Sequence, residues 1–123
     1  LRQLASNHGL TLLPEIHAEY GSLLHEEVAL NGFPVYDFFL PGLVIDALDR
    51  EINTHMLRWI RELDVKGIRT VNMLGCHDGI PVLDLRGKDV NGVNQEGLLS
   101  DEDIEAVRKQ LLNRARLIIK EGG

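Results

Sequence analysis

Cysteine, basic charge and long apolar runs are all scarce in this sequence of 123 residues. Its one cysteine, Cys76, excludes an internal disulfide, and the first residues lack the basic flank and apolar core of a secretory signal, so we expect a cytoplasmic protein. Asp and Glu outnumber Lys and Arg by 19 to 13, and the net charge of -6 offers no basic face to a nucleic acid. No apolar run approaches the roughly 20 residues that a membrane-spanning helix needs. Neither a nucleic acid nor a membrane is therefore an expected partner.

The composition that remains is that of a globular domain, with 44% hydrophobic and 26% charged residues. Short apolar runs rich in β-branched residues predict three strands, at Leu10–His17, Pro34–Leu40 and Gly67–Gly75. Apolar residues at helical spacing predict helices over Glu19–Leu30, over Leu43–Leu63 and from Ser100 onward. The alternation of strands and helices predicts an α/β fold with parallel strands.

The ends of these elements carry start and stop signals. Leu1–Gly9 is typical of a last helical turn, and the chain does not begin with Met, so we expect a piece of a longer protein. Residues 80–97 are rich in Gly, Asn and Asp and predict a long irregular loop. Ser100, followed by Asp103 three positions later, predicts a capping box for the last helix. Three strands cannot close a barrel, so part of the sheet must come from elsewhere.

Two pairs of chemically active residues stand at predicted strand ends. Glu15 and His17 are two apart, so their side chains point to the same side of an extended chain. His77 and Asp78 follow the third strand and precede Gly79, which lets the backbone turn. Functional groups of parallel α/β folds gather at these ends, and two carboxylates facing one cleft are the arrangement of glycoside chemistry. An ion-paired Glu15 and a turn-forming Asp78 stay open as alternatives.

The other reactive side chains have structural interpretations. Cys76 is expected to be a small buried side chain rather than a nucleophile. His25 and His55 lie in predicted helices and are expected to be surface or packing residues. The chain does not show the spacing of three or four converging ligands that zinc needs, so we expect no metal site.

Four segments in order resemble the alpha-amylase superfamily, glycoside hydrolase family thirteen, and above all its sucrose phosphorylase subgroup. They are Leu12–His17, Gly32–Phe38, Thr70–Ile80 and Leu98–Ile104. The resemblance implies that residues 1–123 are a single fragment of a (β/α)8 barrel, from the end of helix four to the helix after strand seven, with residues 80–97 as a long loop. The family's fold would supply the missing strands.

The resemblance also implies roles for individual residues. Glu15 matches the general acid/base, Asp78 the acid that stabilises the transition state, His77 a residue that binds hydroxyls of the glucosyl ring, and His17 a residue near the acceptor site. The family's nucleophile is an aspartate in an Arg-x-Asp motif, which this sequence lacks. The implied activity of the longer protein is a glycosyltransferase reaction, in which a retaining phosphorylase moves glucose from an α-glucoside to inorganic phosphate without a cofactor.

Departures from the subgroup's pattern concern the acceptor. Pro81 and the insertion Arg86–Gly97 are more similar to the glucosylglycerate phosphorylase branch than to sucrose phosphorylases. A leaving group with a carboxylate, such as glycerate, is therefore preferred, and Arg86 or Lys88 could bind it, although a solvated loop charge is the favoured interpretation of both. A hydrolase or transglucosidase of the same superfamily, and a non-catalytic half barrel that self-associates through its open sheet edges, are the alternative functions.

Overall fold

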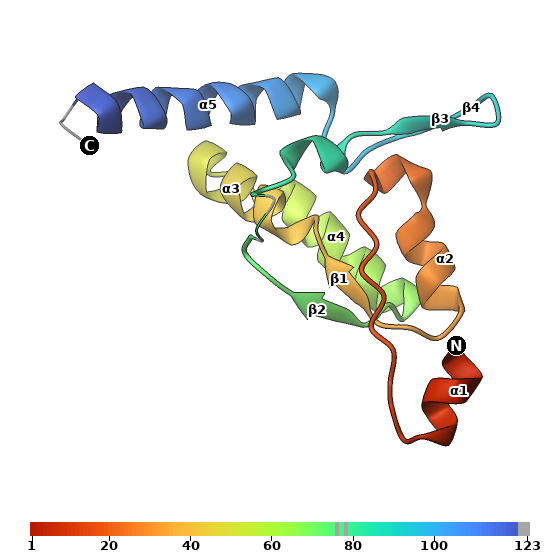
Figure 1. The fold of residues 1–123 in the computed structure, drawn as a ribbon. Helices are drawn as coiled ribbons and strands as arrows, with labels where there is room; N and C mark the ends of the chain where they lie inside the picture. The colour runs from red at the N-terminus through yellow and green to blue at the C-terminus, as the bar shows by residue number, and fades with distance from the viewer. Residues whose placement is uncertain (76, 78, 121–123) are drawn as a thin grey trace.

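The computed structural model describes residues 1–75, 77 and 79–120. Its α-helices and strands are labelled in Figure 1, and the strands are short. In chain order the elements are α1 (Arg2–Asn7), the 3-10 turn η1 (Tyr20–Ser22), α2 (Leu24–Leu30), β1 (Val35–Asp37), α3 (Leu40–Arg50), α4 (Thr54–Lys66), β2 (Thr70–Asn72), the 3-10 turn η2 (Val82–Leu85), β3 (Lys88–Val90), β4 (Val93–Gln95) and α5 (Asp101–Lys120).

The mixed α/β character predicted from the sequence is confirmed, but only two of the three predicted strands form, as β1 and β2, and both are shorter than expected. β1 and β2 pair in parallel, with Val35 opposite Thr70 and Asp37 opposite Asn72. The predicted strand Leu10–His17 is wrong as a strand: the segment is extended, yet none of its residues pairs with another strand in the described chain. An apolar run becomes a strand only where a neighbour completes its hydrogen bonds, and here none does.

The helices follow the predicted amphipathic pattern with two changes. The predicted helix Glu19–Leu30 begins as η1 and becomes α-helical only after Leu23, whose φ of 59° breaks the run. The predicted region Leu43–Leu63 is two helices, because Glu51 adopts a left-handed conformation with φ 54° at the end of α3. α5 begins as predicted: the Asp103 amide donates to Ser100 Oγ at 3.1 Å, and the Ser100 hydroxyl donates to Asp103 Oδ2 at 2.9 Å.

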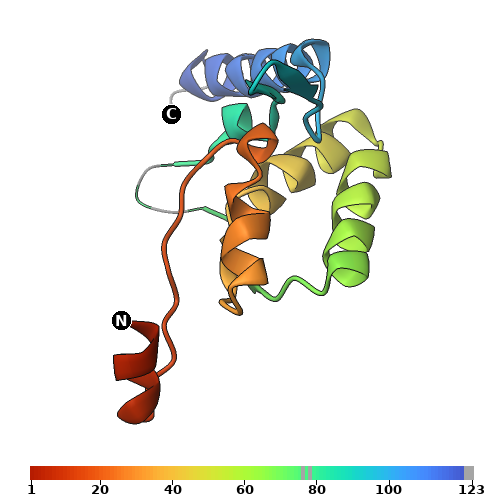
Figure 2. The ribbon, with the colours of Figure 1, turned by 90° about the vertical axis from the view of Figure 1, so that its right-hand side faces the viewer.

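The hydrophobic core lies where α3, α4, η2 and the start of α5 meet (Figure 2). Its most buried apolar side chains are Leu43, Trp59, Leu85, Leu98, Leu99 and Val107. Asp37 is also buried, at the end of β1. Its carboxylate accepts hydrogen bonds from Trp59 Nε1 and from the Leu40 amide, both at 2.9 Å, and burial raises its pKa. An acid within a strand thereby joins β1 to α3 and α4.

The predicted loop, residues 80–97, is more regular than expected. It contains η2 and then the antiparallel hairpin of β3 and β4, in which Lys88 lies opposite Gln95. Asn91 and Gly92 form the hairpin turn, with φ of 52° and 78°. Asn-Gly is a preferred dipeptide for such a turn, because both residues must take a positive φ.

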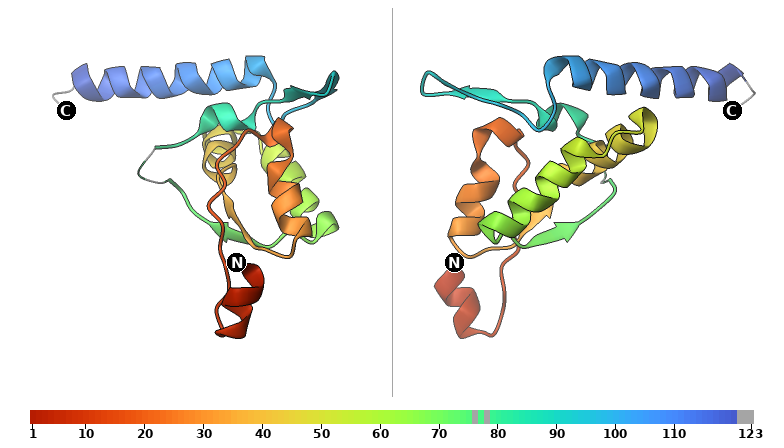
Figure 3. Two further views of the ribbon diagram at one scale, coloured as in Figure 1. Left: turned by 45° about the vertical axis from the view of Figure 1, so that its right-hand side comes forward. Right: turned by 180° about the vertical axis from the view of Figure 1, so that it is seen from behind.

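Much apolar surface is not covered by the described chain. α5 projects beyond the other elements (Figure 3), and residues 112–120 are all exposed. Leu112, Leu117, Ile118 and Ile119 are 52%, 57%, 61% and 70% exposed. No described helix combines the length and hydropathy needed to cross a membrane.

Candidate active site

The candidate site lies where the extended segment, residues 10–19, passes the end of β1. Ile16 and Ala18 from this segment line a small cavity together with Val35 from β1, so the two stretches are neighbours. The side chains of Glu15 and His17 are both exposed. Glu15 has no hydrogen-bond or ion-pair partner among the described residues, which leaves its carboxyl open to solvent.

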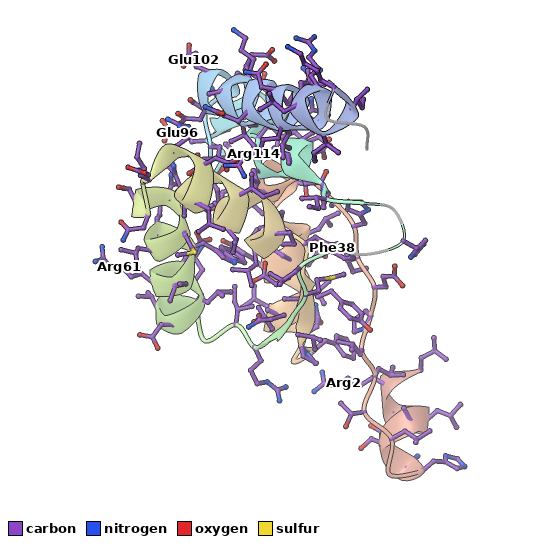
Figure 4. The ribbon with its side chains drawn as sticks, turned by 90° about the vertical axis from the view of Figure 1, so that its left-hand side faces the viewer. Arg2, Phe38, Arg61, Glu96, Glu102 and Arg114 are labelled. Carbon is purple, nitrogen blue, oxygen red and sulfur yellow. The ribbon has the colours of Figure 1, made fainter. Side chains whose placement is uncertain are left out.

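The imidazole of His17 is held by two contacts. On one side it stacks on the Phe38 ring, with centroids 4.7 Å apart and planes 15° from parallel. Phe38 directly follows β1 and is buried, and Figure 4 shows it on the side of the molecule where the extended segment and the loop after β2 lie. At the ring edge, His17 Nε2 contacts the carboxylate oxygen Oδ2 of Asp84. His17 thus joins the end of β1 to η2.

The second predicted pair follows β2. Because β1 and β2 are parallel and Asp37 lies opposite Asn72, the residues after both strands leave the same edge of the sheet. His77 lies in a turn after β2 and is exposed. Asp78, predicted to stabilise the transition state, and Cys76, predicted to be buried, lie outside the described residues. The structure therefore brings His17 to Phe38, at the edge of the sheet from which the chain of His77 also leaves.

Arg86, the predicted binder of an anionic leaving group, is paired within the chain. Its Nη2 donates to Glu19 Oε1 at 3.3 Å, and Lys88 Nζ lies 3.5 Å from Glu19 Oε2. The hydrogen bond from Arg86 is the main cause that lowers the pKa of Glu19. Two cations face one carboxylate, so this cluster carries one positive charge in excess.

Backbone contacts hold the hairpin against η1. The Gly21 amide donates to the Arg86 carbonyl at 3.3 Å. A Cβ on Gly21 would lie 2.2 Å from the backbone nitrogen of Lys88, which is too close for any side chain. The segment that carries Glu15 and the loop that carries Arg86 are therefore fixed to each other at their bases.

A second charged cluster lies on α2 and α4, and its His25 also lines the small cavity that Ile16 and Ala18 line. His25 is buried and stacks on Tyr20, and its Nε2 lies 4.0 Å from Glu62 Oε1. One ligand atom each from His25, Glu26 and Glu62 lies within 4.8 Å of the others, a spacing that could hold a metal ion. Lys66 Nζ, however, already pairs with both carboxylates, at 2.9 Å from Glu62 Oε1. The ammonium group of Lys66 thus supplies positive charge to the Glu26 and Glu62 carboxylates.

The remaining predictions for histidines are met in part, and three residues of interest were not predicted. His25 packs in the core as expected, and His55 Nδ1 pairs with Asp46 Oδ2 at 2.9 Å. Asp84 and Glu19, which hold His17 and Arg86, and Asp46, a fully buried partner of His55, have no sequence motif of their own. Only proximity in the fold identifies them.

No family model matches the chain. Several curated proteins are similar to it in sequence. Over 114 residues, 93% of the chain, it is 58% identical to a sucrose 6(F)-phosphate phosphorylase of Ilumatobacter coccineus. It is 34% identical over 105 residues to a sucrose phosphorylase of Bifidobacterium adolescentis, and 37% identical over 86 residues to a glucosylglycerate phosphorylase of Spirochaeta thermophila. These stretches are 21%, 20% and 13% of the respective relatives, so the chain spans about a fifth of their length or less.

Proposed function

We propose that this chain, a segment of the sucrose phosphorylase subgroup of the alpha-amylase superfamily, supplies part of the active site of a retaining α-glucoside phosphorylase. The reaction would transfer a glucosyl group to inorganic phosphate and give α-glucose 1-phosphate, in the cytoplasm. The observation that carries the proposal is the 58% identity over 93% of the chain to a relative named as a phosphorylase of this type. The exposed acid Glu15 and the residues gathered near it support it.

The fold we propose for the longer protein is a (β/α)8 barrel. The extended segment, β1 and β2 would be three consecutive barrel strands, each followed by helical structure. The parallel pairing of β1 and β2 and the position of residues 16–18 beside β1 support this order. The extended segment would become a paired strand once its other neighbour is present, because its backbone groups then find partners.

In the proposed mechanism, Glu15 is the general acid/base. An aspartate from outside this chain attacks the anomeric carbon while the carboxylic acid of Glu15 gives its proton to the leaving oxygen. The glycosidic bond breaks and a glucosyl ester forms. A phosphate oxygen then attacks the same carbon, the ester bond breaks, and the Glu15 carboxylate accepts the phosphate proton. Asp78 would offset the positive charge that develops on the sugar, and His77 would bind ring hydroxyls.

We further propose an anionic leaving group. The excess positive charge of Arg86 and Lys88 over Glu19 favours an anion on this side of the site. The sequence alone favours glycerate, whereas a phosphate ester on fructose is suggested by the name of the relative with 58% identity. Both are anions, so the charge argument covers either one. His17 would contact this group, next to Glu15.

The test uses the full-length protein that contains this sequence. Sucrose, sucrose 6(F)-phosphate and glucosylglycerate are offered separately, with and without inorganic phosphate, and release of glucose 1-phosphate is measured. We expect release only with phosphate and fastest from an anionic substrate. Glu15→Gln should lower kcat by about 100-fold or more, because general acid catalysis contributes about that much.

The matched control is Glu27→Gln, which changes another exposed acid of the chain, on α2, and should leave the rate unchanged. Free glucose released equally without phosphate would overturn the phosphorylase proposal in favour of a hydrolase that uses the same residues. Equal rates for sucrose and for both anionic substrates would contradict the charge argument alone.

A further inference from the structure

The side chain of His17 depends on Asp84 for its orientation. Residues 11–18 form no backbone hydrogen bond with any described residue, so the extended segment does not itself fix the ring. The stacked contact with Phe38 fixes the plane of the imidazole but permits the ring to flip about its Cβ–Cγ bond, which exchanges the positions of nitrogen and carbon atoms. The contact of His17 Nε2 with Asp84 Oδ2 is the one that selects which ring nitrogen faces which way.

Asp84 is well placed to hold another residue. It lies in η2 between Val82, 7% exposed, and Leu85, fully buried in the core next to α3 and α5. The Asp84 amide donates to the Pro81 carbonyl at 3.1 Å, which closes the turn. Its side chain is only 18% exposed, against 39% for His17. The carboxylate is therefore anchored, and the imidazole is the partner that would otherwise move.

We propose that Asp84 is a positioning residue for the leaving-group side of the site, an inference that rests on the function proposed above. As a carboxylate it only accepts hydrogen bonds, so it requires a proton on Nε2 of His17. In the neutral imidazole this leaves Nδ1 as the acceptor for a hydroxyl of the leaving group. Asp84 touches no substrate; it fixes the tautomer and the angle of the ring that does.

Two side-chain contacts link the extended segment to η2 and the residue that follows it. The turn η2 begins the loop that ends in the β3–β4 hairpin, and Glu19 pairs with Arg86 just after η2. Asp84 and Glu19 therefore tie the same two stretches together at two points, one at the base and one beside Glu15. The Asp84 contact holds an imidazole two residues from Glu15, whereas the Glu19 contact holds the charged side chain of Arg86, so only the Asp84 contact can set the tautomer of a ring in the site.

The experiment compares two substrates of the full-length protein in an Asp84→Asn variant. With a glucoside whose leaving group is large, we expect kcat/KM to fall about tenfold, mostly through KM, because the contact between His17 Nε2 and a carboxylate is lost. With α-glucosyl fluoride, whose small leaving group does not reach His17, kcat/KM should stay within about twofold. A general loss of structure would lower both rates together.

Two further variants complete the test. In a His17→Ala background, Asp84→Asn should have no additional effect, because the residue that it positions is gone. Asp89→Asn, which neutralises an exposed acid in the same loop, should behave as the parent with both substrates. The tautomer is read directly from nitrogen chemical shifts of His17, with a proton on Nε2 expected in the parent and a mixture in Asp84→Asn.

The outcomes separate the inference from the proposed function. If glucose 1-phosphate is never formed, the phosphorylase proposal fails, and the nitrogen shifts of His17 still decide whether Asp84 sets the tautomer. If glucose 1-phosphate is formed but Asp84→Asn changes neither the substrate ratio nor the His17 tautomer, the positioning role is wrong. An equal fall in both rates would also overturn it.

Discussion

The folded structure lowers the pKa of Glu62 strongly. Burial alone would raise its pKa, but the nearby His25 imidazole and hydrogen bonds from Tyr20 and Lys66 lower it to about 2. The folded carboxyl thus binds its proton less tightly than the unfolded one, whose pKa is 4.5. Glu62 therefore stabilises the fold above about pH 4.5, and this stabilisation is lost as the pH falls toward 2. The loss should be of the order of 3 kcal/mol in the free energy of unfolding.

The measurement is urea unfolding of the parent and of Glu62→Gln between pH 2 and 6. The variant should be less stable at pH 6 and should lack this part of the acid dependence. Glu105→Gln is the control, because Glu105 pairs with Arg108 on the exposed side of α5 and both side chains are more than half exposed. Parallel pH curves for the parent and Glu62→Gln would contradict the prediction.

Some residues of the candidate site can be chosen from the sequence and others cannot. Glu15 and His17 could be chosen from the sequence, because an acid and a histidine two apart after an apolar run have a local pattern. Asp84 and Glu19 could not, because their partners are 67 residues away in the chain for both His17–Asp84 and Glu19–Arg86. Only packing brings such pairs together. Asp37 is an acid within a strand, and its buried hydrogen bonds to α3 and α4 explain its presence there.

At the scale of elements, the contact between η1 and the β3–β4 hairpin gives a second prediction. A Cβ on Gly21 would meet the Lys88 nitrogen at 2.2 Å and the Gly87 backbone at 2.6 Å, and backbone cannot give way as a flexible side chain does. Gly21→Ala should therefore push the hairpin away and destabilise the chain by about 1–3 kcal/mol. Amide exchange in β3 and β4 should become faster in the variant than in the parent.

Gly75→Ala is the matched control for this change. The nearest atom to a Cβ there is a side-chain carbon of Ile80 at 3.9 Å, an ordinary contact distance. Thermal unfolding midpoints of the two variants can be compared directly. A Gly21→Ala variant with the parent's midpoint and the parent's exchange rates would mean that the hairpin does not rest on η1 in solution.

The start of α5 supports a third prediction. Ser100 accepts the Asp103 amide and donates to the Asp103 carboxylate, so both members of the capping box are engaged. Ser100→Ala should cost about 1 kcal/mol of unfolding free energy. Urea unfolding measures this cost, and Ser6→Ala in the last turn of α1, where the serine side chain makes no N-terminal cap, is the comparison. A cost as small as that of Ser6→Ala would contradict the prediction.

Helices were predicted better than strands for a physical reason. The amphipathic pattern of α3, α4 and α5 is local, so the sequence contains it in full. A strand needs a neighbour, and the apolar run at residues 10–17 has none in the described chain. The β3–β4 hairpin was missed although Asn91-Gly92 is a strong hairpin signal, because its flanking residues are polar and exposed rather than alternating.

At the scale of the whole molecule, the exposed apolar surface of α5 fits the proposed barrel. The chain spans 21% of the relative from Ilumatobacter coccineus, so most of the polypeptide that could cover this surface lies outside it. Ile118 and Ile119 are 61% and 70% exposed. Replacing both with glutamate should cost the 123-residue chain no more than about 0.5 kcal/mol of unfolding free energy, as for other surface substitutions. It should also reduce the binding of a hydrophobic dye by the chain.

In the full-length protein the same double substitution, Ile118→Glu with Ile119→Glu, should be far more costly. If the remaining barrel covers α5, both carboxylates are buried without partners, and the loss should exceed about 3 kcal/mol. Arg116→Glu changes a nearby exposed position of α5 and should be mild in both proteins. The parent, the double substitution and Arg116→Glu are each made in the chain and in the full-length protein. Unfolding of these proteins tests the barrel without any assay of activity. An equal, small effect of the double substitution in the chain and in the full-length protein would mean that α5 stays exposed to solvent, and the covering role of the rest of the barrel would have to be abandoned.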